Sequence, residues 1–155
     1  MSIEIGKKAP NFKLFDTEKT PHYLEDYKGR NVVLLFFPFA FTSVCTKEMC
    51  TMRDDYSFYG KLGADIIGIS VDSLFTLKKW KEENKLDFTL LSDFNKEVSK
   101  AYNSLYPEWG YGYKGVSKRS SFVIDKTGVI RFIEILENAD DFPNITAINE
   151  VLKKL

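Results

Sequence analysis

Cys45 and Cys50 are the side chains of this sequence best suited to covalent chemistry, and both lie in the segment PFAFTSVCTKEMC, residues 38–50. An apolar run precedes this segment and a helical pattern begins at about Ser43, a plausible cap, so Cys45 is expected in the first turn of a helix. The unpaired N–H groups and the positive end of the helix dipole there favour a thiolate over a thiol. Cys45 is therefore a candidate nucleophile, although free cysteines are also common as small buried residues.

Three nearby residues could assist Cys45. Thr42 precedes it by three positions and can place a hydroxyl beside the sulfur. Pro38 is compatible with a chain that turns sharply and shields a pocket. Glu48 follows Cys45 by about one helical turn and lies on nearly the same face, where it would either orient an arginine or face solvent.

The other candidates for catalysis or metal binding are weak. His22 is the only histidine and lies in a polar segment far from the cysteines in sequence, which argues against a cysteine–histidine dyad. Two cysteines alone do not complete a tetrahedral zinc site, so no metal is expected. Asp72 and Asp93 follow predicted strands and are better explained as helix caps than as catalytic acids.

The composition is that of an ordinary globular protein with one domain, residues 1–155. Lysine plus arginine equals aspartate plus glutamate, so the formal net charge is zero and no nucleic-acid partner is expected. The sequence has no polybasic run and no apolar stretch of roughly 18 to 20 residues, so no membrane association is expected. The N-terminal segment does not resemble a secretory signal, and the expected location is the cytoplasm, where a close pair of cysteines is more often redox-active than structural.

The hydrophobic pattern predicts an α/β fold. Apolar runs at residues 31–37 and 64–71 are typical of strands buried on both faces of a sheet, and DKTG at 125–128 is a hairpin turn. The other predicted elements are helices at 43–62, 72–85, 95–102 and 142–155, strands at 88–91, 120–124 and 129–135, and a loop at 103–118. Parallel strands joined by crossovers, with an antiparallel pair added, predict a thioredoxin-like three-layer sandwich: a central mixed sheet flanked by helices.

Pro38, Thr42 and Cys45 form the pattern P-x-x-x-T-x-x-C, which resembles the active-site signature of the peroxiredoxins. The similarity extends to GKKAPNF at residues 6–12, LEDYKG at 24–29 and RSSFVID at 119–125. The spacing of Cys45 and Cys50 is similar to that of the bacterioferritin-comigratory (PrxQ-like) group, whereas FFPFAFT at 36–42 is more similar to the AhpE-like group.

This resemblance implies a thioredoxin-like fold and the reduction of hydrogen peroxide or organic hydroperoxides, without a metal or organic cofactor. It implies that Cys45 is the peroxidatic cysteine and that Pro38, Thr42 and Arg119 support it. Arg53 is a second candidate arginine, because it also lies in a family-like stretch.

The role of Cys50 depends on the subfamily. In the PrxQ-like group the second cysteine resolves the first as a disulfide, which a thioredoxin-like dithiol would then reduce. Otherwise Cys50 is an inert helix position and the enzyme has one working cysteine, resolved by an external thiol. A disulfide reductase on the same fold usually carries C-x-x-C, which this chain lacks, and a redox-sensing module is the alternative outside enzymes.

The oligomeric state is expected to be a monomer or a homodimer. The loop at 103–118 contains Tyr106, Trp109, Tyr111 and Tyr113, an aromatic group that could form an interface. This feature favours the homodimer.

Overall fold

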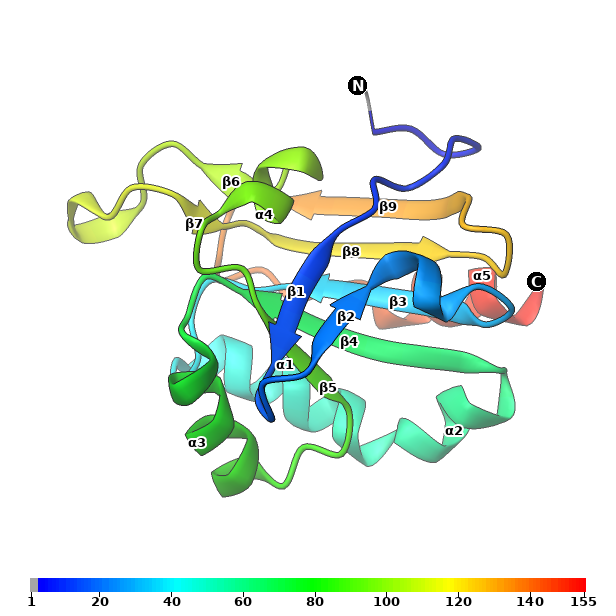
Figure 1. The fold of residues 1–155 in the computed structure, drawn as a ribbon, viewed down its shortest axis with the longest axis horizontal. Helices are drawn as coiled ribbons and strands as arrows, with labels where there is room; N and C mark the ends of the chain where they lie inside the picture. The colour runs from blue at the N-terminus through cyan, green and yellow to red at the C-terminus, as the bar shows by residue number, and fades with distance from the viewer. Residues whose placement is uncertain (1–2) are drawn as a thin grey trace.

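The computed structural model describes residues 3–155, and its elements alternate between strands and helices over most of that length (Figure 1). The strands are β1 (Lys13–Asp16), β2 (Pro21–Tyr23), β3 (Asn31–Phe36), β4 (Ala64–Ser70), β5 (Thr89–Ser92), β6 (Leu105–Tyr106), β7 (Val116–Ser117), β8 (Arg119–Ile124) and β9 (Ile130–Leu136). The helices are α1 (Ser43–Asp54), α2 (Tyr56–Lys61), α3 (Leu74–Asn84), α4 (Glu97–Ala101) and α5 (Ile145–Lys153), with 3-10 turns η1 (Leu24–Tyr27) and η2 (Gly110–Gly112).

Seven of the strands described within residues 3–155 form one mixed sheet in the order β2-β1-β5-β4-β3-β8-β9. The apolar strands β3, β4 and β5 are parallel neighbours, and β8 and β9 continue the sheet in antiparallel fashion on the other side of β3. The three parallel strands therefore end at the same edge of the sheet, and the loops that follow them lie at that edge.

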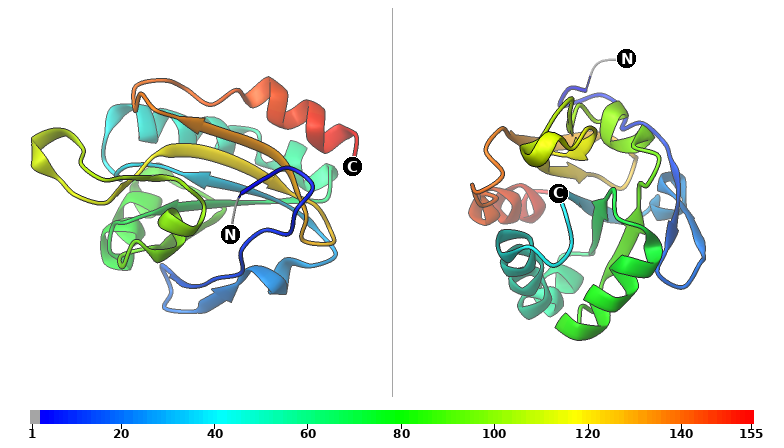
Figure 2. Two further views of the ribbon diagram at one scale, coloured as in Figure 1. Left: turned by 90° about the horizontal axis from the view of Figure 1, so that it is seen from above. Right: turned by 90° about the vertical axis from the view of Figure 1, so that its left-hand side faces the viewer.

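The central strands β3 and β4 are buried on both faces, as their apolar sequences predict. Val33 and Leu35 of β3 pack into a core shared with α1, α2, α3 and α5, while Val32 and Leu34 face a second core shared with α4 and the N-terminal segment. Figure 2 shows the helices α1 and α5 on one side of the sheet and the N-terminal segment on the other. The predicted three-layer α/β architecture is confirmed. None of the helices in residues 3–155 is long and apolar enough to cross a membrane.

The single helix predicted for residues 43–62 is wrong, because the chain forms two helices that meet at Asp55. Asp55 has φ −101° and ψ 11°, outside the helical range. The amide of Phe58 lies 3.0 Å from the carbonyl of Asp55, closer than the amide of Tyr59 at 3.4 Å, so the turn tightens there. An aspartate is a poor interior helix residue because its side chain competes for backbone hydrogen bonds.

Short elements at the edges of the fold were not predicted. The strands β1 and β2 form a hairpin at the sheet edge, and β6 pairs with β7 inside the predicted loop, which extends away from the sheet in Figure 1. His22 lies in β2 rather than in a loop; its Nδ1 atom lies 2.7 Å from the hydroxyl of Tyr27 and its Nε2 atom lies 2.7 Å from Asp16 Oδ2. These contacts give His22 a structural role.

The predicted caps are partly correct. Asp93 accepts hydrogen bonds from the amides of Val98 and Ser99 at the start of α4, as expected, whereas α3 is capped by Ser73, which accepts a hydrogen bond from the amide of Thr76, and not by Asp72. Ser43 was expected to cap the first long helix, but it is the first residue of α1 and Thr42 occupies the cap position.

Candidate active site

Cys45 lies in the first turn of α1, which begins at the edge of the sheet where β3 ends. The first hydrogen bond of the helix runs from the amide of Thr46 to the carbonyl of Thr42, so the amides of the preceding turn are free to face an anion. Only 1% of the Cys45 surface is exposed. The sulfur is therefore held at the positive end of a helix and shielded from bulk water.

Arg119, the first residue of β8, supplies a fixed positive charge beside the sulfur. Its Nη2 atom lies 3.2 Å from Cys45 Sγ, and its Nη1 atom donates to Glu48 Oε1 at 2.6 Å. Residues 45 and 119 are brought together because β8 pairs antiparallel with β3, with Ser120 opposite Phe36, so that β8 begins beside the end of β3 from which the chain leads into α1. The guanidinium is 2% exposed, which makes its charge effective at short range because little water screens it.

The carbonyl of Ala139 fixes the orientation of Arg119. It accepts hydrogen bonds from Nε at 3.2 Å and from Nη2 at 2.9 Å. Burial acts to lower the pKa of Arg119, but the neighbouring Glu48 and Cys45 outweigh it and raise that pKa. The arginine therefore remains a cation with its donors aimed at the helix start.

Glu48 is fully buried in the second turn of α1. Burial raises its pKa to about 7, against the opposing effect of the Arg119 cation. Within residues 3–155, its Oε2 atom is buried without a hydrogen-bond partner, which adds to the cost of ionising the carboxyl. Near neutral pH this side chain therefore exchanges between a neutral carboxyl and a carboxylate that competes with Cys45 for the charge of Arg119.

The loop between β3 and α1 is held in an unusual conformation. Pro38 is buried two residues after the end of β3, and Phe41 has φ +68°, a left-handed conformation that costs a non-glycine residue about 1 kcal/mol or more. The amide of Ala40 donates to Asp72 Oδ2 at 2.8 Å, and the hydroxyl of Ser70 donates to the same oxygen at 2.7 Å. Asp72, expected as a helix cap, instead ties this loop to the end of β4.

Thr42 lies at the N-cap position with its side chain half-buried. Its hydroxyl donates to the carbonyl of Phe39 at 2.7 Å rather than to the start of the helix. Because the proton of the hydroxyl is used in this way, the oxygen lone pairs remain available to accept a hydrogen bond from a protonated group.

Cys50 and Arg53 lie further along α1 and contact α3. The thiol of Cys50 donates to Asn84 Oδ1 at 3.8 Å, and Arg53 Nη1 donates to the carbonyl of Asn84 at 2.7 Å. Arg53 also pairs with its neighbour Asp54. Both cysteines are free thiols in the structure. Of the two candidate arginines, Arg119 is the one placed against Cys45.

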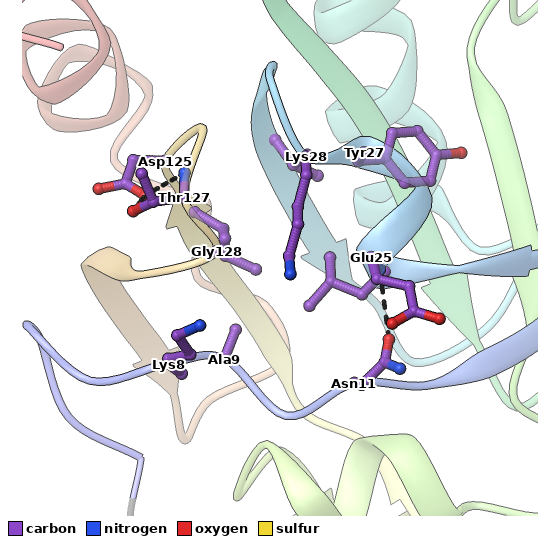
Figure 3. Close-up of a pocket in the computed structure, with 12 residues that line it drawn as sticks. Lys8, Ala9, Asn11, Glu25, Tyr27, Lys28, Asp125, Thr127 and Gly128 are labelled. Carbon is purple, nitrogen blue, oxygen red and sulfur yellow. Dashed lines mark hydrogen bonds between the residues drawn. The ribbon is translucent and has the colours of Figure 1, made fainter.

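A pocket of about 140 Å³ lies at the other end of β8, where Ile124 is the last residue of the strand and Arg119 is the first. Figure 3 shows it between the N-terminal segment and the turn at 125–128, with Lys8 and Lys28 at its rim. It is smaller than the roughly 300 Å³ usual for ligand sites. Its lining includes neither cysteine, so we assign the chemistry to the edge near Cys45.

The structure thus brings together Cys45, Glu48 and Arg119 among the residues singled out in the sequence, with Pro38 and Thr42 in the adjoining loop. Sequence reasoning missed the carbonyl of Ala139 and the carboxylate of Asp72. A backbone carbonyl leaves no signal in the sequence. Asp72 was noticed but interpreted as a cap, and only the fold shows that Ala40 lies within reach of it.

Comparison with known proteins identifies the family of this chain. The model of the AhpC/TSA family matches residues 5–133, and the chain belongs to that family. It is 41% identical over 130 residues to peroxiredoxin Bcp of Bacillus subtilis, covering 83% of this chain and 82% of the relative. It is 40% identical over 134 residues to the chloroplastic peroxiredoxin Q of Oryza sativa subsp. japonica, covering 84% of this chain and 58% of that longer protein.

Among solved structures, the chain is similar to the peroxidoxin BcpB of Mycobacterium tuberculosis. The TM-score is 0.83 at 28% sequence identity, over 98% of this chain and 96% of the other. The resemblance to the peroxiredoxins, drawn from the pattern around Cys45, is confirmed. The names of these relatives agree with the Bcp and PrxQ group rather than with the AhpE-like alternative.

Proposed function

We propose that this protein is a thiol-dependent peroxidase that reduces hydrogen peroxide and organic hydroperoxides through Cys45. The observation that carries the proposal is the contact of 3.2 Å between Arg119 Nη2 and Cys45 Sγ at a buried helix start. A peroxidase needs a thiolate together with donors for the charge that develops on the peroxide oxygens. Cys45 would supply the thiolate, and Arg119 and the free amides of α1 would supply the donors. Membership of the AhpC/TSA family agrees with this chemistry.

In the first step, the Cys45 thiolate attacks one peroxide oxygen and the O–O bond breaks. Cys45 is oxidised to a sulfenic acid, and the other oxygen takes up one proton from solvent, in place of the proton that the thiol released on ionising, and leaves as water or an alcohol. The guanidinium of Arg119 would stabilise first the thiolate and then the oxygens, while the lone pairs of Thr42 would accept a hydrogen bond from the protonated peroxide oxygen. Pro38 would shield Cys45 and the bound peroxide from bulk water.

Cys50 is the proposed resolving residue. Its sulfur displaces the oxygen of the sulfenic acid, so that a Cys45–Cys50 disulfide forms and one water leaves. On an intact helix, residues five positions apart differ by about 140° around the axis and by roughly 7.5 Å along it, which places their Cα atoms about 8 to 9 Å apart. A disulfide needs a distance of less than about 7 Å between the two Cα atoms, so the start of α1 must unwind before this bond forms.

An external dithiol, such as a thioredoxin-like protein, would then reduce the exposed disulfide and return both thiols.

The homodimer is a proposal supported by the loop between β6 and β7, where Tyr111 is 90% exposed and Tyr113 packs edge-on against Phe39 at 5.8 Å. Sedimentation at several dilutions tests it, and a single monomeric species throughout would exclude it. The cytoplasmic location stays a prediction.

The proposed function is tested by peroxide consumption with a dithiol donor. We expect the wild-type protein to turn over repeatedly and Cys45→Ser to be inactive while remaining folded, because a serine hydroxyl stays protonated at neutral pH. Retained turnover in Cys45→Ser would exclude Cys45 as the nucleophile. A rate of Cys45 oxidation no higher than that of free cysteine would favour a redox-sensing module instead.

A further inference from the structure

Helix α1 is bound to helix α3 by side-chain contacts that the chemistry of Cys45 does not require. The indole of Trp80 donates from Nε1 to Thr46 Oγ1 at 3.1 Å, directly after Cys45 in the chain. Asn84, one helical turn further along α3, accepts from the thiol of Cys50 at 3.8 Å. Two side chains of one helix therefore hold the two ends of the segment that would have to unwind.

These two side chains are themselves held in place. Trp80 is 1% exposed and its ring packs against Phe37 with centroids 5.1 Å apart. The side-chain nitrogen Nδ2 of Asn84 donates to the backbone carbonyl of Trp80 at 2.9 Å. This hydrogen bond turns the side-chain oxygen Oδ1 of Asn84 towards Cys50. A fixed partner stabilises the wound helix more than a mobile one, because less side-chain entropy is lost when the contact forms.

We propose that Trp80 and Asn84 are positioning residues that hold the start of α1 wound, and so set how fast Cys50 reaches the oxidised Cys45. This inference rests on the proposed function, in which Cys50 resolves Cys45. The governed step is attack of the Cys50 sulfur on the sulfenic sulfur: the S–S bond forms, the S–O bond breaks, and the oxygen leaves as water with the proton of Cys50. Both contacts must open before that attack, since the disulfide does not fit the wound helix.

The contact of Arg53 with Asn84 sets the limit of the unwound segment. Arg53 lies three residues beyond Cys50, and its Nη1 atom donates to the backbone carbonyl of Asn84 at 2.7 Å. This contact does not involve the side chain of Asn84, from which Cys50 must separate. We therefore expect opening of residues 45–50 while the helix from Arg53 onward stays in place. Slower opening keeps Cys45 longer as a sulfenic acid, which a second peroxide can oxidise further.

Trp80→Phe and Thr46→Val test the proposal, because each removes one side of the same hydrogen bond. Disulfide formation after one equivalent of hydrogen peroxide is followed by acid quenching and intact mass. We expect each variant to form the disulfide about fivefold faster, the factor that corresponds to one ordinary hydrogen bond. The double variant should be no faster than the single ones, because the two changes remove one interaction.

Thr51→Val is the matched control, since the hydroxyl of Thr51 donates to the carbonyl of Lys47 within α1 and not to α3. It should leave the rate of disulfide formation unchanged. Equal acceleration by Thr51→Val would overturn the proposal, because general weakening of the helix would then explain the effect. Unchanged rates in Thr46→Val, a variant at a partly exposed position, would overturn it even if Trp80→Phe failed to fold.

Asn84→Ala tests the second contact in the same assay. It should accelerate disulfide formation and reduce the fraction of protein over-oxidised by excess peroxide, without changing the rate of the first oxidation. An equal change in the first oxidation would overturn the proposal, since Asn84 would then act on the peroxide site. Absence of any disulfide in the wild type would instead contradict the resolving role of Cys50, so the two failures are distinguishable.

Trp80 also provides a spectroscopic signal. The chain has two tryptophans, so in Trp109→Phe the emission comes from Trp80 alone. Loss of the Thr46 contact should change that emission at the rate of disulfide formation, after the sulfenic acid has formed. An emission that stays constant through disulfide formation would show that Trp80 keeps its partner, contrary to the proposal.

Discussion

Replacing Glu48 by glutamine tests the charge balance beside Cys45, because the two side chains have nearly the same shape and only the carboxyl can ionise. Burial raises the pKa of Glu48 from 4.5 to about 7 in the folded protein. The folded state therefore keeps a proton on Glu48 that the unfolded chain releases above about pH 4.5. The stabilisation is complete below pH 4.5 and is lost as the pH rises through about 7.

The loss of stability with rising pH can be calculated from the pKa shift of Glu48. At about 1.4 kcal/mol per pH unit, the shift from 4.5 to about 7 corresponds to a loss on the order of 3 kcal/mol in the free energy of unfolding. Glu48→Gln cannot show this loss, since an amide does not titrate. The difference in stability between the two proteins should therefore move in favour of the glutamine variant as the pH rises.

The assay is urea unfolding from about pH 5 to about pH 8, a range that spans the folded pKa of Glu48. Both proteins carry Cys45→Ser, so that the thiol does not contribute to the pH dependence. Parallel stability profiles for the two proteins would contradict the raised pKa of Glu48, because Glu48 would then have the same proton affinity in the folded and unfolded states.

Three further substitutions have defined outcomes. Arg119→Ala should slow the reaction of Cys45 with peroxide by about 10²-fold or more, measured by stopped-flow kinetics, because one donor to the reacting oxygens is lost, and an unchanged rate would remove Arg119 from the site. Cys50→Ser should react once with peroxide and stop as a sulfenic acid, seen as one added oxygen by mass, whereas repeated turnover with the dithiol would exclude a resolving role. Gly68→Ala should lower the free energy of unfolding by about 1 to 3 kcal/mol, since the new Cβ would lie 2.7 Å from Leu90 Cδ2, and equal urea midpoints would contradict this packing.

The parts of the fold that sequence predicts well are those with strong hydrophobic runs. The strands β3 and β4 are buried on both faces and read as continuous apolar segments, which few other structures produce. The strands β1 and β2 are four and three residues long and lie at the sheet edge, so they carry almost no pattern. The break at Asp55 was missed because the apolar spacing continues across it.

The residues of the candidate site also differ in how well the sequence predicts them. Cys45 could be found from its place between a buried strand and a helix, whereas Arg119 is 74 residues away and was identified only by resemblance to a family. The partners of Arg119 are harder still, because Ala139 contributes a carbonyl that every residue has. The contact of Trp80 with Thr46 joins two helices across the core and depends on how they pack, which no local pattern specifies.

The role of Cys45 as the peroxide-attacking residue is tested by intact mass and peptide mapping of the reduced protein after one equivalent of hydrogen peroxide. We predict the loss of two hydrogens and a cross-linked peptide that contains Cys45 and Cys50. In Cys50→Ser, the same treatment should add one oxygen to Cys45 alone. Oxygen found on Cys50 with Cys45 still reduced, or no change in mass in either protein, would contradict the assignment of Cys45 as the residue that attacks the peroxide.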